Sequence, residues 1–145
     1  MHARMINGQK GQATYVIVLQ AGDEVIAALQ GFVDSEEISA AQFSAIGAFS
    51  RATLRYFDWR TKSYEDNPVT EQVEVAALNG DVALAPDGSR ALHIHTVLGR
   101  RDGSALAGHL GEGHVRPTLE IVLREMPRHL HKKTDPETGL ALIAL

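Results

Sequence analysis

Hydrophobic and polar residues change their spacing along the chain, and the changes separate short strands from one helix. Residues 13–20, ATYVIVLQ, form a β-branched run with the length and composition of a strand. From Asp23 onward the apolar residues, among them Leu29 and Phe32, recur at the spacing of one helical face. The pattern therefore predicts an amphipathic helix that packs against a sheet, with Asp23 as its N-cap.

Most of the remaining chain predicts strands and turns. Residues 41–59 predict two strands broken near Gly47, and residues 61–68, TKSYEDNP, predict an exposed turn. Residues 71–78 alternate like a strand and meet Asn79-Gly80, the strongest hairpin-turn signal in the chain. Further strands are predicted at residues 81–85, 92–98, 104–110, 118–125 and 139–145.

These elements describe one domain. The chain has 145 residues, which is near the usual size of a single domain. About eight strands with one main flanking helix are typical of an α+β domain built on a mostly antiparallel sheet. We expect residues 13–145 to form this domain and the polar residues 1–12 to be a flexible N-terminal segment.

Composition narrows the possible functions. The formal net charge of -4 argues against strong sequence-independent binding to polyanions such as nucleic acids. The absence of cysteine excludes disulfides, thiolate zinc sites and a cysteine nucleophile, so a metal must be held by histidine, carboxylate or water. Because we find neither a secretory signal nor an apolar run long enough to span a membrane, we expect a cytoplasmic protein without membrane contact.

Residues 92–110, LHIHTVLGRRDGSALAGHL, bring several histidines into one predicted hairpin. His93 and His95 are two residues apart in a strand, so their side chains share a face. If residues 99–103 form the whole turn, the pairing sets His93 directly opposite His109. The three imidazoles then converge, as a three-histidine zinc site with an open fourth position requires.

Each of these histidines also has a structural interpretation. A His-x-His pair on a strand can be a hydrogen-bonded pair instead of a pair of ligands, and a turn one residue shorter would move His109 to the opposite face. We interpret His114, and the second pair His129 and His131, as solvated loop residues. Three-histidine ligation suits zinc, but iron, nickel, cobalt and copper stay open as alternatives.

The histidine hairpin also resembles a known family. LHIHTVLGRRDGSALAGHL, followed by Gly113, Thr118 and Glu120, is similar to the hallmark region of the plants-and-prokaryotes conserved (PPC) domain. The resemblance extends upstream to EQVEVAALNGDVAL and spans roughly Tyr15 to the C-terminus. It implies a mixed, largely antiparallel sheet with a flanking helix, assembled as a homotrimer.

The resemblance has implications for metal and partners as well. Some microbial members of the family hold a metal through histidines at the positions of His93, His95 and His109, and stand-alone members are labelled as DNA-binding. In plants the domain follows an AT-hook, whose Arg-Gly-Arg-Pro core is missing from this sequence, so we expect no DNA binding by that route. The basic clusters are Arg100 with Arg101, and Arg128 with Lys132 and Lys133. We interpret them as solvated loops; the alternative is a weak polyanion contact that a trimer would repeat three times.

Two functions stay open. The first is a stand-alone regulatory module without enzymatic activity, which binds DNA or a protein and carries a structural or regulatory metal. The alternative is a metal-dependent hydrolase or lyase with a glutamate as acid or base. Glu120 is the catalytic candidate and Glu74 the second; each is also interpreted as a partnered structural carboxylate, Glu120 with Arg51. The sequence identifies neither a substrate nor a physiological partner.

Overall fold

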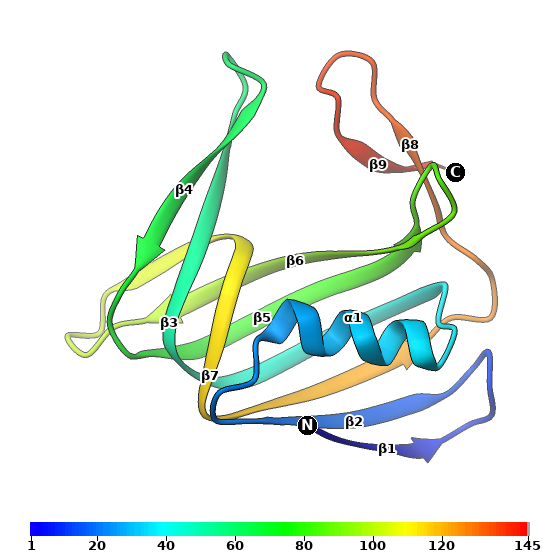
Figure 1. Ribbon diagram of the computed structural model, residues 1–145, viewed down its shortest axis with the longest axis horizontal. Helices are drawn as coiled ribbons and strands as arrows, with labels where there is room; N and C mark the ends of the chain where they lie inside the picture. Colours follow the sequence, from blue (N-terminus) through cyan, green and yellow to red (C-terminus); the bar gives the residue numbers. More distant parts are fainter. Residues whose placement is uncertain (145) are drawn as a thin grey trace.

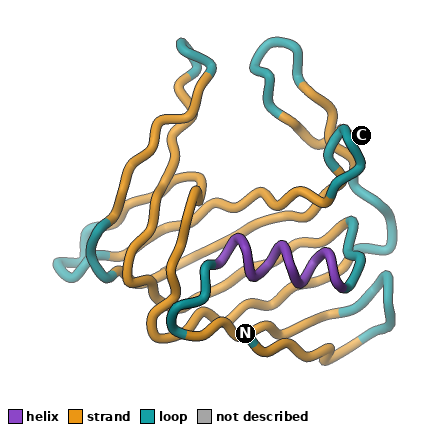
Figure 2. Tube along the Cα trace, in the orientation of Figure 1, coloured by secondary structure: helices purple, strands orange, loops and turns teal. Residues whose placement is uncertain are grey.

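The computed structural model describes residues 1–144 and shows a strongly bent sheet with one helix across one face (Figures 1 and 2). Within these residues the chain forms nine strands and one helix, which confirms the α+β class. The helix α1 spans Val25–Ser35. The strands are β1 (His2–Asn7), β2 (Thr14–Gln20), β3 (Ala40–Asp58), β4 (Ser63–Val69), β5 (Val73–Leu84), β6 (Arg90–Gly99), β7 (Ala105–Glu125), β8 (His131–Thr134) and β9 (Ala141–Ala144).

The sheet is mixed and mostly antiparallel, as predicted. Its main strand order is β1-β2-β7-β3-β5-β8-β9, with β4 paired to β3. The pairing of β5 with β8, through Leu84 and His131, is parallel, and the other strand pairs are antiparallel. Strand β6, which carries His93 and His95, bonds to both β5 and β7. Strand β7 carries His109, so the three histidines lie where the sheet bends. The edge strand β1 lies within the segment predicted to be flexible.

The helix packs as its spacing predicts, but it begins differently. Leu29 and Phe32 are buried against the inner face of the sheet, where they join one continuous core. The N-cap is Glu24 and not Asp23, because the Glu24 carboxylate accepts hydrogen bonds from two backbone N–H groups of the first turn. Asp23 instead accepts a hydrogen bond from the backbone N–H of Gln20 at 2.9 Å.

The predicted turn at residues 79–80 is wrong, because β5 continues through it as one strand. Gly80 serves close packing here: a Cβ at this position would lie 2.3 Å from the Phe43 ring and 2.6 Å from the carbonyl oxygen of His93. Since β5 does not turn back, Asp81 stays in the strand and pairs with His93 of β6. This difference matters for the site described below.

The region predicted as two strands and an exposed turn is one long hairpin. Strand β3 passes Gly47 with an irregularity in its pairing, where a Cβ would lie 2.2 Å from the carbonyl oxygen of Thr118. Residues 61–68 are largely strand β4, exposed but paired with β3. In Figure 1 the β3–β4 hairpin and the β8–β9 hairpin project on the same side of the molecule, and β6 runs between their bases.

Candidate metal centre

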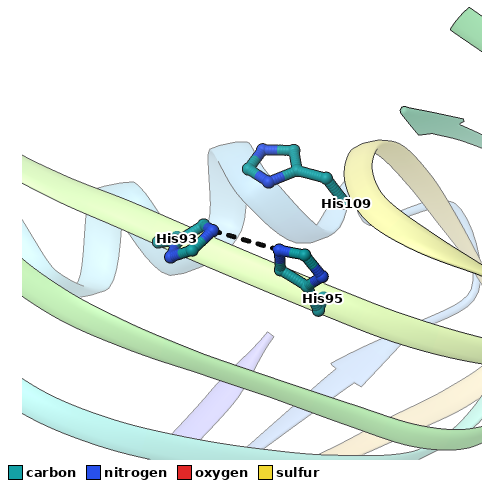
Figure 3. A group of neighbouring side chains, drawn as sticks. All are labelled: His93, His95 and His109. Atoms are coloured by element: carbon teal, nitrogen blue, oxygen red, sulfur yellow. Dashed lines mark hydrogen bonds between the residues drawn. The ribbon is translucent and has the colours of Figure 1, made fainter. Parts of the chain in front are cut away.

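Three imidazoles gather in the bend of the sheet, two from β6 and one from β7. His93, His95 and His109 each offer one ring nitrogen, and these nitrogens lie within 4.8 Å of one another. The ring centroids are 4.9 to 5.3 Å apart, and Figure 3 shows the three rings turned toward a common space. The predicted convergence of these three side chains is therefore present in the fold.

The pairing that brings them together differs from the predicted one. His95, not His93, lies directly opposite His109. The turn consists of residues 100–104, closed by a hydrogen bond from the Arg100 N–H to the Ser104 carbonyl, and Gly99 pairs with Ala105. Because this shift moves each cross-strand partner by two residues, it keeps the side chains on the same face and the histidines still meet.

The environment of His95 and His109 favours neutral imidazoles, the form that binds metals. Burial, followed by the charges of His93 and His95, lowers the pKa of His109 to about 4. Burial, followed by the charge of His93, also lowers the pKa of His95. The buried Nδ1 of His109 has no hydrogen-bond partner among residues 1–144. A buried nitrogen without a hydrogen bond lowers the stability of the fold. Coordination of a metal by that nitrogen would remove this cost.

A carboxylate that was not predicted from the sequence, that of Asp81, lies beside His93. Asp81 Oδ2 lies 3.4 Å from Nδ1 of His93, while Nε2 of His93 lies 3.1 Å from Nε2 of His95. A carboxylate on one imidazole nitrogen leaves the other nitrogen free for a metal, a common arrangement around bound zinc. The signal available in the sequence was the place of Asp81 in the predicted strand 81–85, which directly precedes the predicted strand of His93 and His95.

Lys132 contacts Asp81 from a different strand. Lys132 of β8 is only 7% exposed, and its Nζ lies 3.3 Å from Asp81 Oδ1. Burial opposes the ionisation of Asp81, but the hydrogen bond from His93 and the charge of Lys132 outweigh it, so the pKa of Asp81 is lowered. Asp81 therefore links the histidines to the β8–β9 hairpin, and the interpretation of Lys132 as a solvated loop residue is wrong.

A cavity of about 580 Å³ opens above the histidines. Its lining residues come from β4, β6, β7, β8 and the β8–β9 hairpin: Tyr64, Ala91, Leu92, His93, His95, His109, Lys132, Leu140, Ala141, Leu142 and Ile143. The Tyr64 ring lies 5.1 Å from the His109 ring, centroid to centroid. The three imidazoles therefore face a space large enough for a small molecule.

The structure places the two predicted glutamates elsewhere. Glu120 is exposed on β7, where it pairs with Val18 of β2 and Ile46 of β3, and it is eleven residues along the strand from His109. Glu74 is exposed on β5 opposite Gly99. Neither glutamate is part of the group of side chains that gathers around the histidines.

Arg51 and His114 belong to a separate cluster. Arg51, the expected partner of Glu120, instead contacts Nε2 of His114 at 2.9 Å and Glu112 at 3.9 Å. His114 also contacts the Glu112 carboxylate directly. His114 is therefore a partly buried strand residue with two charged neighbours, and its interpretation as a solvated loop residue is wrong.

Similarity to known proteins agrees with the fold. A protein from Bacteroides thetaiotaomicron described as a candidate DNA-binding protein is 28% identical over 98% of this chain and 96% of its own, with a TM-score of 0.88. A PPC protein from Pyrococcus horikoshii is 31% identical over 97% and 98%, with a TM-score of 0.85. A metal-containing protein from Archaeoglobus fulgidus is 28% identical over 100% and 99%, with a TM-score of 0.83.

No curated protein matches the chain. No helix within residues 1–144 is long and apolar enough to cross a membrane. The sequence matches the Plants and Prokaryotes Conserved (PCC) domain, also abbreviated PPC, over residues 6–127. With most of its length inside that match, the chain belongs to the PPC domain family.

Proposed function

We propose that this PPC-domain protein binds one divalent transition metal through His93, His95 and His109. The observation that carries the proposal is the convergence of three imidazole nitrogens within 4.8 Å. Nδ1 of the partly buried His109 is itself inaccessible and has no hydrogen-bond partner among the described residues. Three nitrogen ligands with an open fourth position suit zinc. A bound metal would supply a cross-link between β6 and β7 and a Lewis acid that faces the cavity.

Elemental analysis by plasma mass spectrometry tests the metal proposal. We expect untagged protein to carry about one zinc or other transition metal per chain, as a single three-histidine site requires. His93→Ala and His109→Ala should each lose that metal while keeping the circular dichroism spectrum of the native protein. Native protein without metal, even after incubation with zinc, would overturn the proposal.

We further propose that the chain assembles as a homotrimer. Along β3 and β7, alternate residues face away from α1, and among them Ile46 is 62% and Val122 is 46% exposed. Exposed apolar residues gathered on one open sheet face are typical of a protein contact, and a second copy is the partner that the family implies. Light scattering should give three chains per particle, and Ile46→Asp should give single chains.

The regulatory partner is proposed to be a protein or DNA, and the charges bear on the choice. The similarity to proteins described as candidate DNA-binding proteins supports DNA as the partner. Carboxylates, however, already neutralise Arg55, Arg100 and Lys132 through ion pairs of 2.8, 3.0 and 3.3 Å. A salt titration of DNA binding decides, because genuine phosphate contacts weaken steeply as salt rises. Binding that is absent or independent of salt would favour the protein partner.

The cavity favours a metal-dependent enzyme as the second candidate function. It holds the three histidines and Lys132, and Asp81 joins His93 to Lys132. In such an enzyme Asp81 and Lys132, and not Glu120, would be the charged side chains near the reacting atoms. A screen of hydrolase and lyase substrates with the zinc-loaded protein tests this alternative, and His109→Ala is its control.

A further inference from the structure

The charges around the histidine cavity do not balance once a metal binds. Three neutral imidazoles leave the charge of a divalent metal uncompensated. Asp81 is the carboxylate beside the histidines, and the ammonium of Lys132 at 3.3 Å already neutralises it. The cavity of a metal-loaded chain is therefore electropositive, which favours an anionic ligand.

The walls of the same cavity are apolar. Ala141 and Ile143 of β9 line it, and Tyr64 of β4 lines it beside His109. Ile143 pairs with Lys132 across the β8–β9 hairpin, so the cation and the apolar wall share one face of that hairpin. A polar floor with apolar walls is the usual composition of a small-molecule site, and about 580 Å³ lies within the common range of about 300–1,000 Å³.

Lys132 has the position and the donors to contact a ligand directly. It lines the cavity although it is only 7% exposed, so its ammonium is held in place and largely shielded from water. An ammonium carries three N–H donors, and its nitrogen lies 3.3 Å from Asp81 Oδ1 on one side. Lys133, the next residue of β8, is exposed and is absent from the cavity lining, which makes it a matched control.

We infer that this cavity binds a small carboxylate with an apolar body. The carboxylate lies between the metal and Lys132, and the apolar body lies against Tyr64, Ala141 and Ile143. The inference rests on the proposed metal site, and it adds the chemical class of the ligand and the side chains that select it.

Calorimetric titration of the zinc-loaded protein with three probes tests the inference. We expect 3-phenylpropionate to bind at least about tenfold more tightly than 3-phenylpropanamide, which lacks the charge, or propionate, which lacks the apolar body. Binding should fall at least about tenfold when zinc is removed. Equal affinity for the carboxylate and the amide, or no binding of any probe, would overturn the inference.

Variants assign the selectivity to side chains. Lys132→Gln should weaken 3-phenylpropionate binding about tenfold and leave amide binding unchanged, whereas Lys133→Gln should change neither. Ile143→Ser, at a residue that is 44% exposed, should weaken phenylpropionate binding and leave that of propionate unchanged. Unchanged carboxylate binding in both Lys132→Gln and Ile143→Ser would overturn the assignment even if one of them folds poorly.

Zinc content is measured on every preparation, so that two failures stay distinct. Protein that carries zinc but binds no carboxylate overturns the ligand inference and leaves the metal site intact. Protein that takes up no zinc overturns the proposed function and the ligand inference together. If a second copy of the chain fills the cavity in the assembled protein, the zinc-loaded oligomer will bind no probe, and that outcome also overturns the inference.

Discussion

The chain contains two His-x-His motifs on neighbouring parts of the fold, and their surroundings differ. His93 and His95 lie in β6, with His109 across the strand pair and Asp81 beside His93. In the second motif, residues 129–131, the rings are 6.4 Å apart and both residues are exposed. His129 shares a hydrogen bond with the hydroxyl of Ser39.

The difference shows that spacing alone does not make a metal site. Both motifs have the same spacing, which puts two imidazoles on one side of the chain wherever the chain is extended. The first gains a third imidazole through the β6–β7 pairing, partial burial that lowers the pKa of His109, and a carboxylate near the far nitrogen of His93. The second pairs, through His131, with Ala144 of β9, which offers no ligand. The first motif is therefore the one expected to retain a metal.

The largest expected effect comes from the same substitution made in both motifs. His95→Ala should reduce the metal content from about one ion per chain to none, because two imidazoles on a strand pair no longer hold zinc tightly. His131→Ala should leave the metal content unchanged. Plasma mass spectrometry on both proteins measures this, and a loss of metal in His131→Ala would show that the second motif contributes to the site.

Removal of the metal should lower the stability of the first region. A ligand that binds only the folded chain stabilises it by about 2.7 kcal/mol when its free concentration is 100 times its Kd. We therefore expect chelation to lower the Tm of the native protein by several degrees, and to leave that of His109→Ala unchanged. Differential scanning calorimetry with and without chelator measures the change, and an equal fall in both proteins would show a general effect of the chelator.

The sequence predicted the class of fold and the face of the histidines, for a physical reason. Alternation fixes which side of a strand each residue faces, and the two-residue error in the hairpin pairing did not change that side. Strand ends were less predictable. Asn79-Gly80 is a strong turn signal locally, but the Phe43 ring requires a glycine at residue 80 within a continuous strand. Tertiary packing therefore overrode the local preference.

The pattern of residues along the chain did not predict the charged neighbours of the histidines. Asp81 reaches His93 because β5 pairs with β6, and Lys132 reaches Asp81 because β8 adds to the edge of β5. Both contacts join residues of different strands, and each depends on a strand pairing that the spacing of residues along one strand does not specify. Glu120 was a candidate because it projects from its strand on the face opposite an apolar stripe, but β7 carries it away from the histidines.

Asp81 provides a smaller test of what distinguishes the two motifs. Asp81→Asn keeps the size of the side chain but removes the charge that holds His93, so we expect zinc affinity to fall about 10- to 100-fold. Competition with a chromophoric chelator measures the affinity. Asp66→Asn, which breaks the exposed ion pair with Arg55, is the control and should leave the affinity unchanged. An unaltered affinity in Asp81→Asn would mean that the three imidazoles alone orient themselves.

The smallest expected effect comes from completing the second motif. Ala144 lies directly opposite His131, as His109 lies opposite His95, so Ala144→His supplies a third imidazole at the matching place. We measure zinc binding in the background of His109→Ala, where the native site is lost, with His131→Ala added as the control. His129 and His131 are exposed, and within residues 1–144 no carboxylate contacts them as Asp81 contacts His93, so the affinity should be at least about 100-fold below that of the native site. An affinity close to the native one would show that cross-strand placement of three histidines is sufficient, and that burial and the carboxylate add little.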